Sequence, residues 1–100
     1  MDYKVVYTAQ VERDLSDIVS FLAAKNPAAA EKTGHALLDA AESLGSLPYR
    51  GPVMKGRPSL RKFPHLPYHI IIYQVDEPAR LVEILRIWDG RRNPHLFLLP

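Results

Sequence analysis

The chain has 100 residues, of which 47% are hydrophobic, and its formal net charge is +2. This composition indicates one globular domain over residues 1–100 and excludes a disordered chain. The chain has no cysteine, which excludes disulfides and thiol catalysis. No apolar run reaches the roughly 18 residues of a membrane span and no signal peptide is recognised, so we expect a cytoplasmic protein that does not contact a membrane.

The first half predicts a strand followed by two helices. Residues 3–7 (YKVVY) are β-branched and aromatic, as is typical of a strand. Thr8 is a suitable N-cap for a helix over residues 9–25, where apolar residues recur at helical spacing. Asn26 and Pro27 end this helix and begin a second one that reaches about residue 45. Because the junction is short, the two helices should form an antiparallel hairpin.

The second half predicts a loop and three strands. Residues 48–58 contain three prolines and two glycines, a composition typical of a loop, and loops of this length are often functional. Residues 59–63, 68–75 and 80–88 are predicted strands, and residues 76–79 form a hairpin turn between the last two. The order β-α-α-β-β-β predicts an α+β fold in which the helical hairpin covers one face of a small, mainly antiparallel sheet.

Alternation along the strands predicts which side chains face solvent. Arg61 and Phe63 share one face of their strand, and residues 80, 82, 84, 86 and 88 share one face of theirs. A charged Arg86 does not suit a core, so this face should be the open one. Exchange of Arg86 for glutamate is then expected to weaken the action of the protein on any molecule that binds this face, with little loss of stability.

Positive charge is concentrated in the second half of the chain. Residues 1–47 carry four Lys/Arg and seven Asp/Glu, whereas residues 48–100 carry nine and four. The basic residues form three groups, with aromatic residues between them: Arg50, Lys55 and Arg57; Arg61 and Lys62; Arg86, Arg91 and Arg92, interleaved with Tyr68, Tyr73 and Trp88. Such a surface on the open face would suit RNA or an acidic protein. Alternatively, the arginines only cover apolar sheet edges.

Groups that could transfer protons are ambiguous. His65, His69 and His95 are candidates, and each also fits a structural role. Asp89 beside Arg91 is most simply a salt bridge that forms a turn. There is no phosphate-binding glycine loop, Ser/His/Asp order or metal-ligand spacing, so we expect no cofactor and no metal. The apolar residues at 95–100 either fold back onto the domain or need a partner.

Several motifs, in this order and spacing, resemble the RelE/ParE superfamily of toxins. They lie at residues 3–8, 14–18, 26–30, 44–51, 60–61, 68–73 and 86–92, and cover nearly the whole chain. The resemblance implies a RelE/ParE-like fold and a toxin of a type II toxin–antitoxin pair. It also implies a cognate antitoxin whose acidic or amphipathic segment wraps around the toxin in a hetero-oligomer.

The resemblance implies different targets for the two branches. RelE-like members cleave messenger RNA on the ribosome, and ParE-like members poison DNA gyrase. The motif RIWDGRR is closer to that of ParE, although Asp89 stands where a histidine is common. No tyrosine follows Tyr73, which argues against RelE-type chemistry. We therefore expect first a ParE-like toxin that binds a nucleic-acid-handling target such as gyrase. The residues expected to bind that target are Lys55, Arg57, Arg61, Arg86, Trp88, Arg91 and Arg92.

Two alternatives remain open at this point. The first is a RelE-like endonuclease acting on ribosome-bound mRNA, with catalytic candidates Arg61, Tyr68, His69, Arg86, Arg91 and His95. The second is an inert or regulatory binding module whose toxicity has been lost.

Overall fold

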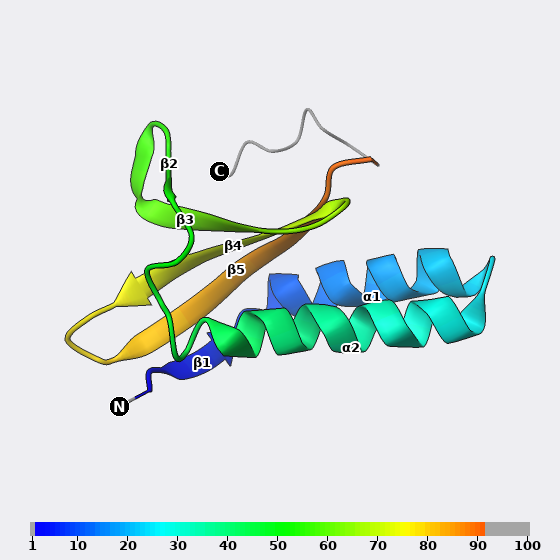
Figure 1. Ribbon diagram of the computed structural model, residues 1–100, viewed down its shortest axis with the longest axis horizontal. Coiled ribbons are helices and arrows are strands. Elements are labelled where there is room, and N and C mark those ends of the chain that lie inside the picture. The colour runs from blue at the N-terminus through cyan, green and yellow to red at the C-terminus, as the bar shows by residue number, and fades with distance from the viewer. Residues whose placement is uncertain (1, 92–100) are drawn as a thin grey trace.

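Two helices pack against one face of a five-stranded sheet in the computed structural model, which describes residues 2–91 (Figure 1). The elements are β1 (Lys4–Tyr7), α1 (Ala9–Ala23), α2 (Pro27–Ser43), β2 (Val53–Met54), β3 (Arg57–His65), β4 (His69–Asp76) and β5 (Leu81–Asp89). The strand order is β1-β5-β4-β3-β2, with β1 parallel to β5 and every other pair antiparallel. The predicted α+β fold is confirmed.

The starts of both helices are held by the residues predicted as caps. The Oγ1 atom of Thr8 accepts a hydrogen bond from the Val11 amide at 3.2 Å. The Oδ1 atom of Asn26 accepts one from the Ala29 amide at 3.1 Å, and Pro27 is the first residue of α2. These bonds satisfy amide groups that have no partner within the helix. Neither helix is long and apolar enough to cross a bilayer.

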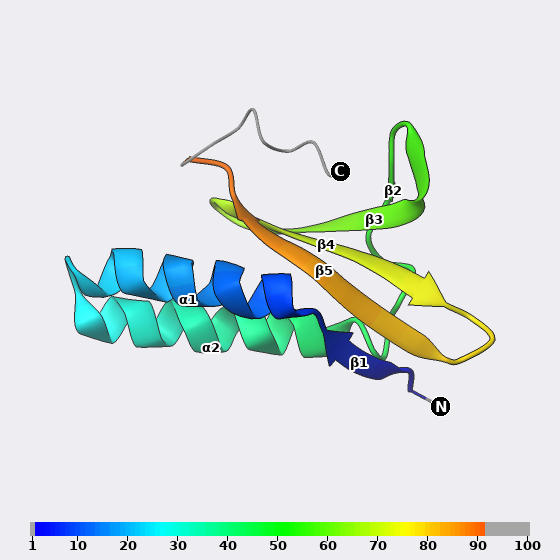
Figure 2. The same cartoon turned by 180° about the vertical axis from the view of Figure 1, so that it is seen from behind.

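The main core lies between the helices and the sheet. It joins helical residues such as Leu37 and Leu44 to Ile71, Tyr73 and Ile84 of the central strands. A second, smaller cluster on the opposite face contains Met54, Leu60 and Ile72, with Ile70 and Leu85 against it. Met54 of β2 packs in this second cluster. The hairpin of β2 and β3 bends away from the helices (Figures 1 and 2). The segment predicted as a loop therefore contains a strand and the start of β3.

A β-bulge at Leu85 changes the facing of β5. Tyr73 pairs with Ile84, but its neighbour Ile72 pairs with Arg86, so Leu85 is the additional residue. Val82 and Ile84 therefore face the helices, whereas Arg86 and Trp88 lie on the open face. The prediction that residues 80–88 keep one alternation was wrong, since an extra residue reverses every side chain that follows it.

The facing predicted for Arg61 was also wrong. Arg61 pairs with Tyr73, and Phe63 pairs with Ile71, and both partners belong to the main core. Arg61 and Phe63 thus share a face as predicted, but that face is the one covered by the helices. The next residue of β3, Lys62, pairs with Ile72 and lies on the open face instead.

Candidate functional site

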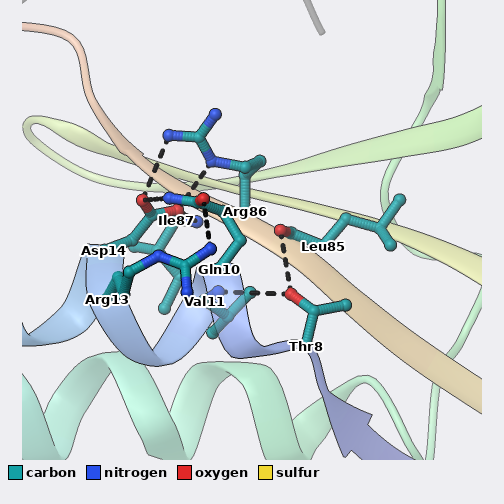
Figure 3. A network of polar contacts seen from close by, with 8 residues as sticks. All are labelled: Thr8, Gln10, Val11, Arg13, Asp14, Leu85, Arg86 and Ile87. Atoms are coloured by element: carbon teal, nitrogen blue, oxygen red, sulfur yellow. Dashed lines mark hydrogen bonds and ion pairs between the residues drawn. The ribbon is translucent and has the colours of Figure 1, made fainter. Parts of the chain in front are cut away.

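The first turns of α1 seal the edge of β5 that β1 leaves uncovered. Beyond Tyr7, the amide of Thr8 donates to the Ile84 carbonyl at 3.2 Å. The Thr8 hydroxyl donates to the Leu85 carbonyl at 3.3 Å. Two residues further along β5, the amide of Ile87 donates to Asp14 Oδ2 at 3.0 Å. Along this edge, beyond β1, the bulged strand is therefore fixed to the start of α1, while its other edge pairs with β4 (Figure 3).

Arg86 forms a bidentate pair with Asp14 across this junction. Its Nε lies 2.8 Å from Asp14 Oδ2 and its Nη2 lies 3.1 Å from Oδ1 (Figure 3). The Asp14 side chain is only 7% exposed and that of Arg86 is 25% exposed. The Arg86 guanidinium also lies 5.6 Å from the centre of the Trp88 ring. Arg86 thus lies on the open face as predicted, but Asp14 neutralises its charge within the chain.

A cleft on the open face lies between the start of α1 and the hairpin of β2 and β3. Its volume is about 520 Å³, and its walls are formed by Thr8, Gln10, Gly56, Arg57, Ser59, Leu60, Leu85 and Arg86. Arg57 is exposed, as is Lys55 at the neighbouring turn, where Gly56 adopts a φ of +79°. One residue from each of two predicted basic groups, Arg57 and Arg86, thus lines this cleft, and Arg61 is not among the residues that line it.

A second cluster lies where β5 ends beside the turn between β3 and β4. The Arg91 guanidinium contacts both oxygens of Asp89, with distances of 3.2 Å from Nε and 3.0 Å from Nη2, as predicted for this pair. The same guanidinium lies 3.8 Å from the centre of the exposed Tyr68 ring. His69 pairs with Asp89 across the strands, and its Nε2 lies 3.7 Å from Asp89 Oδ2.

Burial controls the protonation of His69. Its Nε2 has no hydrogen-bond partner among residues 2–91, and the residue is only 5% exposed. Burial lowers the pKa of His69 despite the nearby carboxylate of Asp89. Burial would raise the pKa of Asp89, but hydrogen bonds from the Arg91 side chain and backbone more than offset it and lower that pKa. Near neutral pH, His69 is therefore a neutral imidazole, and Arg91 neutralises the Asp89 carboxylate beside it.

We expect the stability of the domain to fall between about pH 7 and pH 5, with His69 responsible for part of the loss. The pKa of His69 is below 6.5 in the folded state, so the unfolded chain binds the proton first as the pH falls. Protonation therefore favours unfolding from about pH 6.5 downward. Urea unfolding across this range measures the effect. A His69→Phe variant should show a flatter profile, and an unchanged profile would contradict this role for His69.

Arg61 belongs to a third cluster, on the side of the sheet that faces the helices. Its Nη1 donates to the Gly51 carbonyl at 2.8 Å, and its guanidinium lies 4.9 Å from the centre of the Tyr49 ring. Arg50 lies 4.5 Å from the centre of the Phe63 ring and donates to Ser43 Oγ at 3.2 Å. The three basic groups predicted to meet on one face therefore occupy different surfaces.

The sequence matches the family model for the ParE toxin of type II toxin–antitoxin systems, parDE, over residues 5–94. The chain belongs to the ParE toxin family.

Solved structures agree with the fold of this ParE-family toxin. The structure of the toxin–antitoxin complex RelBE2 from Mycobacterium tuberculosis matches with a TM-score of 0.70 and 21% identity, covering 89% of this chain and 99% of that chain. The chromosomal ParDE system from P. aeruginosa matches with a TM-score of 0.75 and 18% identity, covering 87% and 95%. No curated protein sequence matches. The family and fold identify the chain as a type II toxin of the RelE/ParE superfamily.

The structure does not place every residue predicted for the toxin's site. Arg92 and His95 lie outside the described residues. Asp14 was missed as a site residue, although the sequence contains a signal for it. Asp14 follows Val11 by three residues and precedes Ile18 by four, so it lies on the apolar stripe of α1. A carboxylate at such a position requires a buried cation or donors, and Arg86 and the Ile87 amide supply them.

Proposed function

We propose that this ParE-family toxin inhibits growth by binding a nucleic-acid-handling enzyme, with DNA gyrase as the target, and that it does not cleave RNA. One observation carries the proposal. Arg86 and Arg91, which a cleavage reaction would use to stabilise negative charge, are each held by a carboxylate of the same chain.

RNA cleavage by attack of a 2′-hydroxyl needs cations directed at the phosphate and a pair of proton-transfer groups. The Asp14 and Asp89 carboxylates cancel most of the field of the two arginines. His69 is buried beside Asp89, while Arg86 lies on the opposite face of the sheet. Tyr68, His69 and Arg91 lie near one another, but Arg61 and Arg86 do not join them. The described residues thus do not bring all the catalytic candidates to one point, which supports binding rather than catalysis.

The partner that would neutralise the toxin is a cognate antitoxin. The similar solved structures are of toxin–antitoxin systems, which supports a partner of this kind. The basic second half of the chain would complement an acidic segment of that antitoxin. The open-face cleft beside Arg57 and Lys55 is the proposed surface for the target.

Two assays run on the same protein test this function. The purified toxin should block DNA supercoiling by gyrase and should produce no ribosome-dependent cuts in messenger RNA. Arg57→Ala should weaken gyrase inhibition about tenfold, which corresponds to roughly 1.4 kcal/mol of binding energy. Lys25→Ala, a change in an exposed residue near the end of α1, is the control and should leave inhibition unchanged.

Codon-specific cuts without an effect on supercoiling would overturn the proposal in favour of a RelE-type endonuclease. Growth unaffected by induction of the protein would instead indicate a module without toxicity.

A further inference from the structure

The arginines of the described chain differ in whether a carboxylate holds them. Arg80, Arg86 and Arg91 lie within ion-pair distance of Glu77, Asp14 and Asp89, respectively. Within residues 2–91, neither Arg50 nor Arg61 has such a carboxylate partner, and both instead lie over aromatic rings. Positive charge that remains available to an anionic ligand is therefore found beside these two residues, on the surface opposite the cleft.

The arginine–aromatic cluster, which we define as Tyr49, Arg50, Arg61 and Phe63, combines the end of the loop after α2 with the edge of β3. Arg61 and Phe63 are two residues apart on one face of β3, a spacing of about 6.6 Å. Val53 and Met54 of β2 pair with β3, and the Lys62 amide donates to the Pro52 carbonyl at 3.0 Å, so the described pairing along this edge reaches Lys62 but not Phe63. Tyr49 is 49% exposed, and Arg50 is exposed as well.

The cluster is fixed in place before any ligand binds. The buried Tyr73 hydroxyl donates to the Pro48 carbonyl at 2.7 Å and accepts from the Gly51 amide at 3.0 Å. These bonds hold the segment that carries Tyr49 and Arg50 against the sheet. The Gly51 carbonyl in turn holds Arg61. Side chains that are already ordered lose less entropy when they bind, so this arrangement favours recognition of a ligand.

We propose that the arginine–aromatic cluster binds a single DNA strand. Aromatic rings and guanidinium planes stack on unpaired bases, while guanidinium N–H groups bind phosphate oxygens. An acidic peptide would use the charge of the arginines but has no need of the two rings. The inference rests on the proposed function, since a toxin that acts on gyrase works beside DNA, and it adds a nucleic-acid contact away from the target-binding cleft.

Binding of a fluorescein-labelled oligo-dT strand, followed by fluorescence anisotropy without gyrase, tests the inference. Tyr49→Ala should weaken binding about 5- to 150-fold, the effect of losing one stacked base. Arg50→Ala should weaken binding and lower the salt slope by about one, because one phosphate contact is lost. Both residues are exposed, so thermal unfolding should show that the variants remain folded.

Arg80→Ala is the matched control. Arg80 also lies over a tyrosine ring, 4.2 Å from the centre of Tyr3, but it pairs with Glu77 at the turn between β4 and β5. Its replacement should leave oligo-dT binding unchanged. Equal losses for Arg80→Ala and Arg50→Ala would overturn the inference, because binding would then depend only on net charge.

Competing strands and peptides identify the ligand. An abasic strand of equal length should bind as weakly to the native protein as oligo-dT binds to Tyr49→Ala. Oligoglutamate that competes as well as oligo-dT would assign the cluster to an acidic protein, and tenfold tighter binding of oligo-U would assign it to RNA. Either result would overturn the DNA proposal. Gyrase inhibition without any oligo-dT binding would overturn this inference alone, whereas oligo-dT binding without gyrase inhibition would overturn only the proposed target.

Discussion

Replacing Asp14 with alanine is expected to lower the free energy of unfolding by about 3–5 kcal/mol. The substitution leaves the Arg86 guanidinium without its bidentate partner and the Ile87 amide without its acceptor. Asp14 is 7% exposed, so water does not readily replace the lost carboxylate. Urea unfolding of the native and variant proteins measures the loss.

Asp17→Ala is the control for Asp14, because Asp17 is an exposed carboxylate on the same helix. Its removal should change stability by less than about 0.5 kcal/mol. A loss below about 1 kcal/mol for Asp14→Ala would contradict the role of the pair and would leave the Arg86 charge available to a ligand. Arg86→Glu should destabilise the domain at least as much as Asp14→Ala, since it places a second carboxylate beside Asp14. Because of the pair with Asp14, this expectation differs from the one based on sequence alone, which was little loss of stability.

Tyr73→Phe is expected to cost about 2–4 kcal/mol of stability. The change removes one oxygen atom, yet it leaves the Pro48 carbonyl and the Gly51 amide without their partner in a buried region. These two hydrogen bonds of the Tyr73 hydroxyl anchor the loop.

Gly51→Ala tests the same anchor by adding a Cβ atom where neighbouring atoms leave no room for it. A Cβ atom at residue 51 would lie 2.7 Å from the Lys62 carbonyl oxygen and 2.8 Å from the Tyr73 hydroxyl oxygen. Because one of these neighbours is backbone, the loop or β3 would have to move.

Tyr49→Phe removes a hydroxyl from an exposed tyrosine of the same loop and is the control for Tyr73→Phe. It should leave stability within about 0.5 kcal/mol of the native value. Comparable losses in the two variants would show that the Tyr73 hydroxyl is not an anchor. If the anchor holds the arginine–aromatic cluster in place, Tyr73→Phe should also weaken oligo-dT binding while Tyr49→Phe does not.

Local chemistry in the sequence was enough to predict the helices and the order of the elements except the short strand β2. Thr8, Asn26 and Pro27 each act through atoms within a few residues, so their capping roles follow from sequence spacing alone. The junction between the helices leaves only an antiparallel hairpin. The connection of β1 to the sheet follows as well, because the hairpin returns the chain to the side from which it started.

The facing of the basic residues could not be predicted, because it depends on contacts between distant segments. The bulge at Leu85 exists where β5 pairs with β4 on one side and meets the start of α1 on the other. No local signal in RLVEILRIW marks which residue is the extra one. Arg61 was assigned to the open face together with the other basic groups that were expected to meet there. The Gly51 carbonyl and the Tyr49 ring instead give it partners beside the core.

The position of β5 has a consequence for when the toxin can act. Among the described strands β5 comes last in the chain, and it is inserted between β1, which comes first, and β4. A growing chain that has not yet released β5 therefore cannot complete the sheet, and Asp14 has nothing to neutralise it. The sheet cannot be completed until β5 has left the ribosome, because it depends on contacts between remote parts of the chain. Chains truncated before β5 should accordingly be harmless to the cell that makes them.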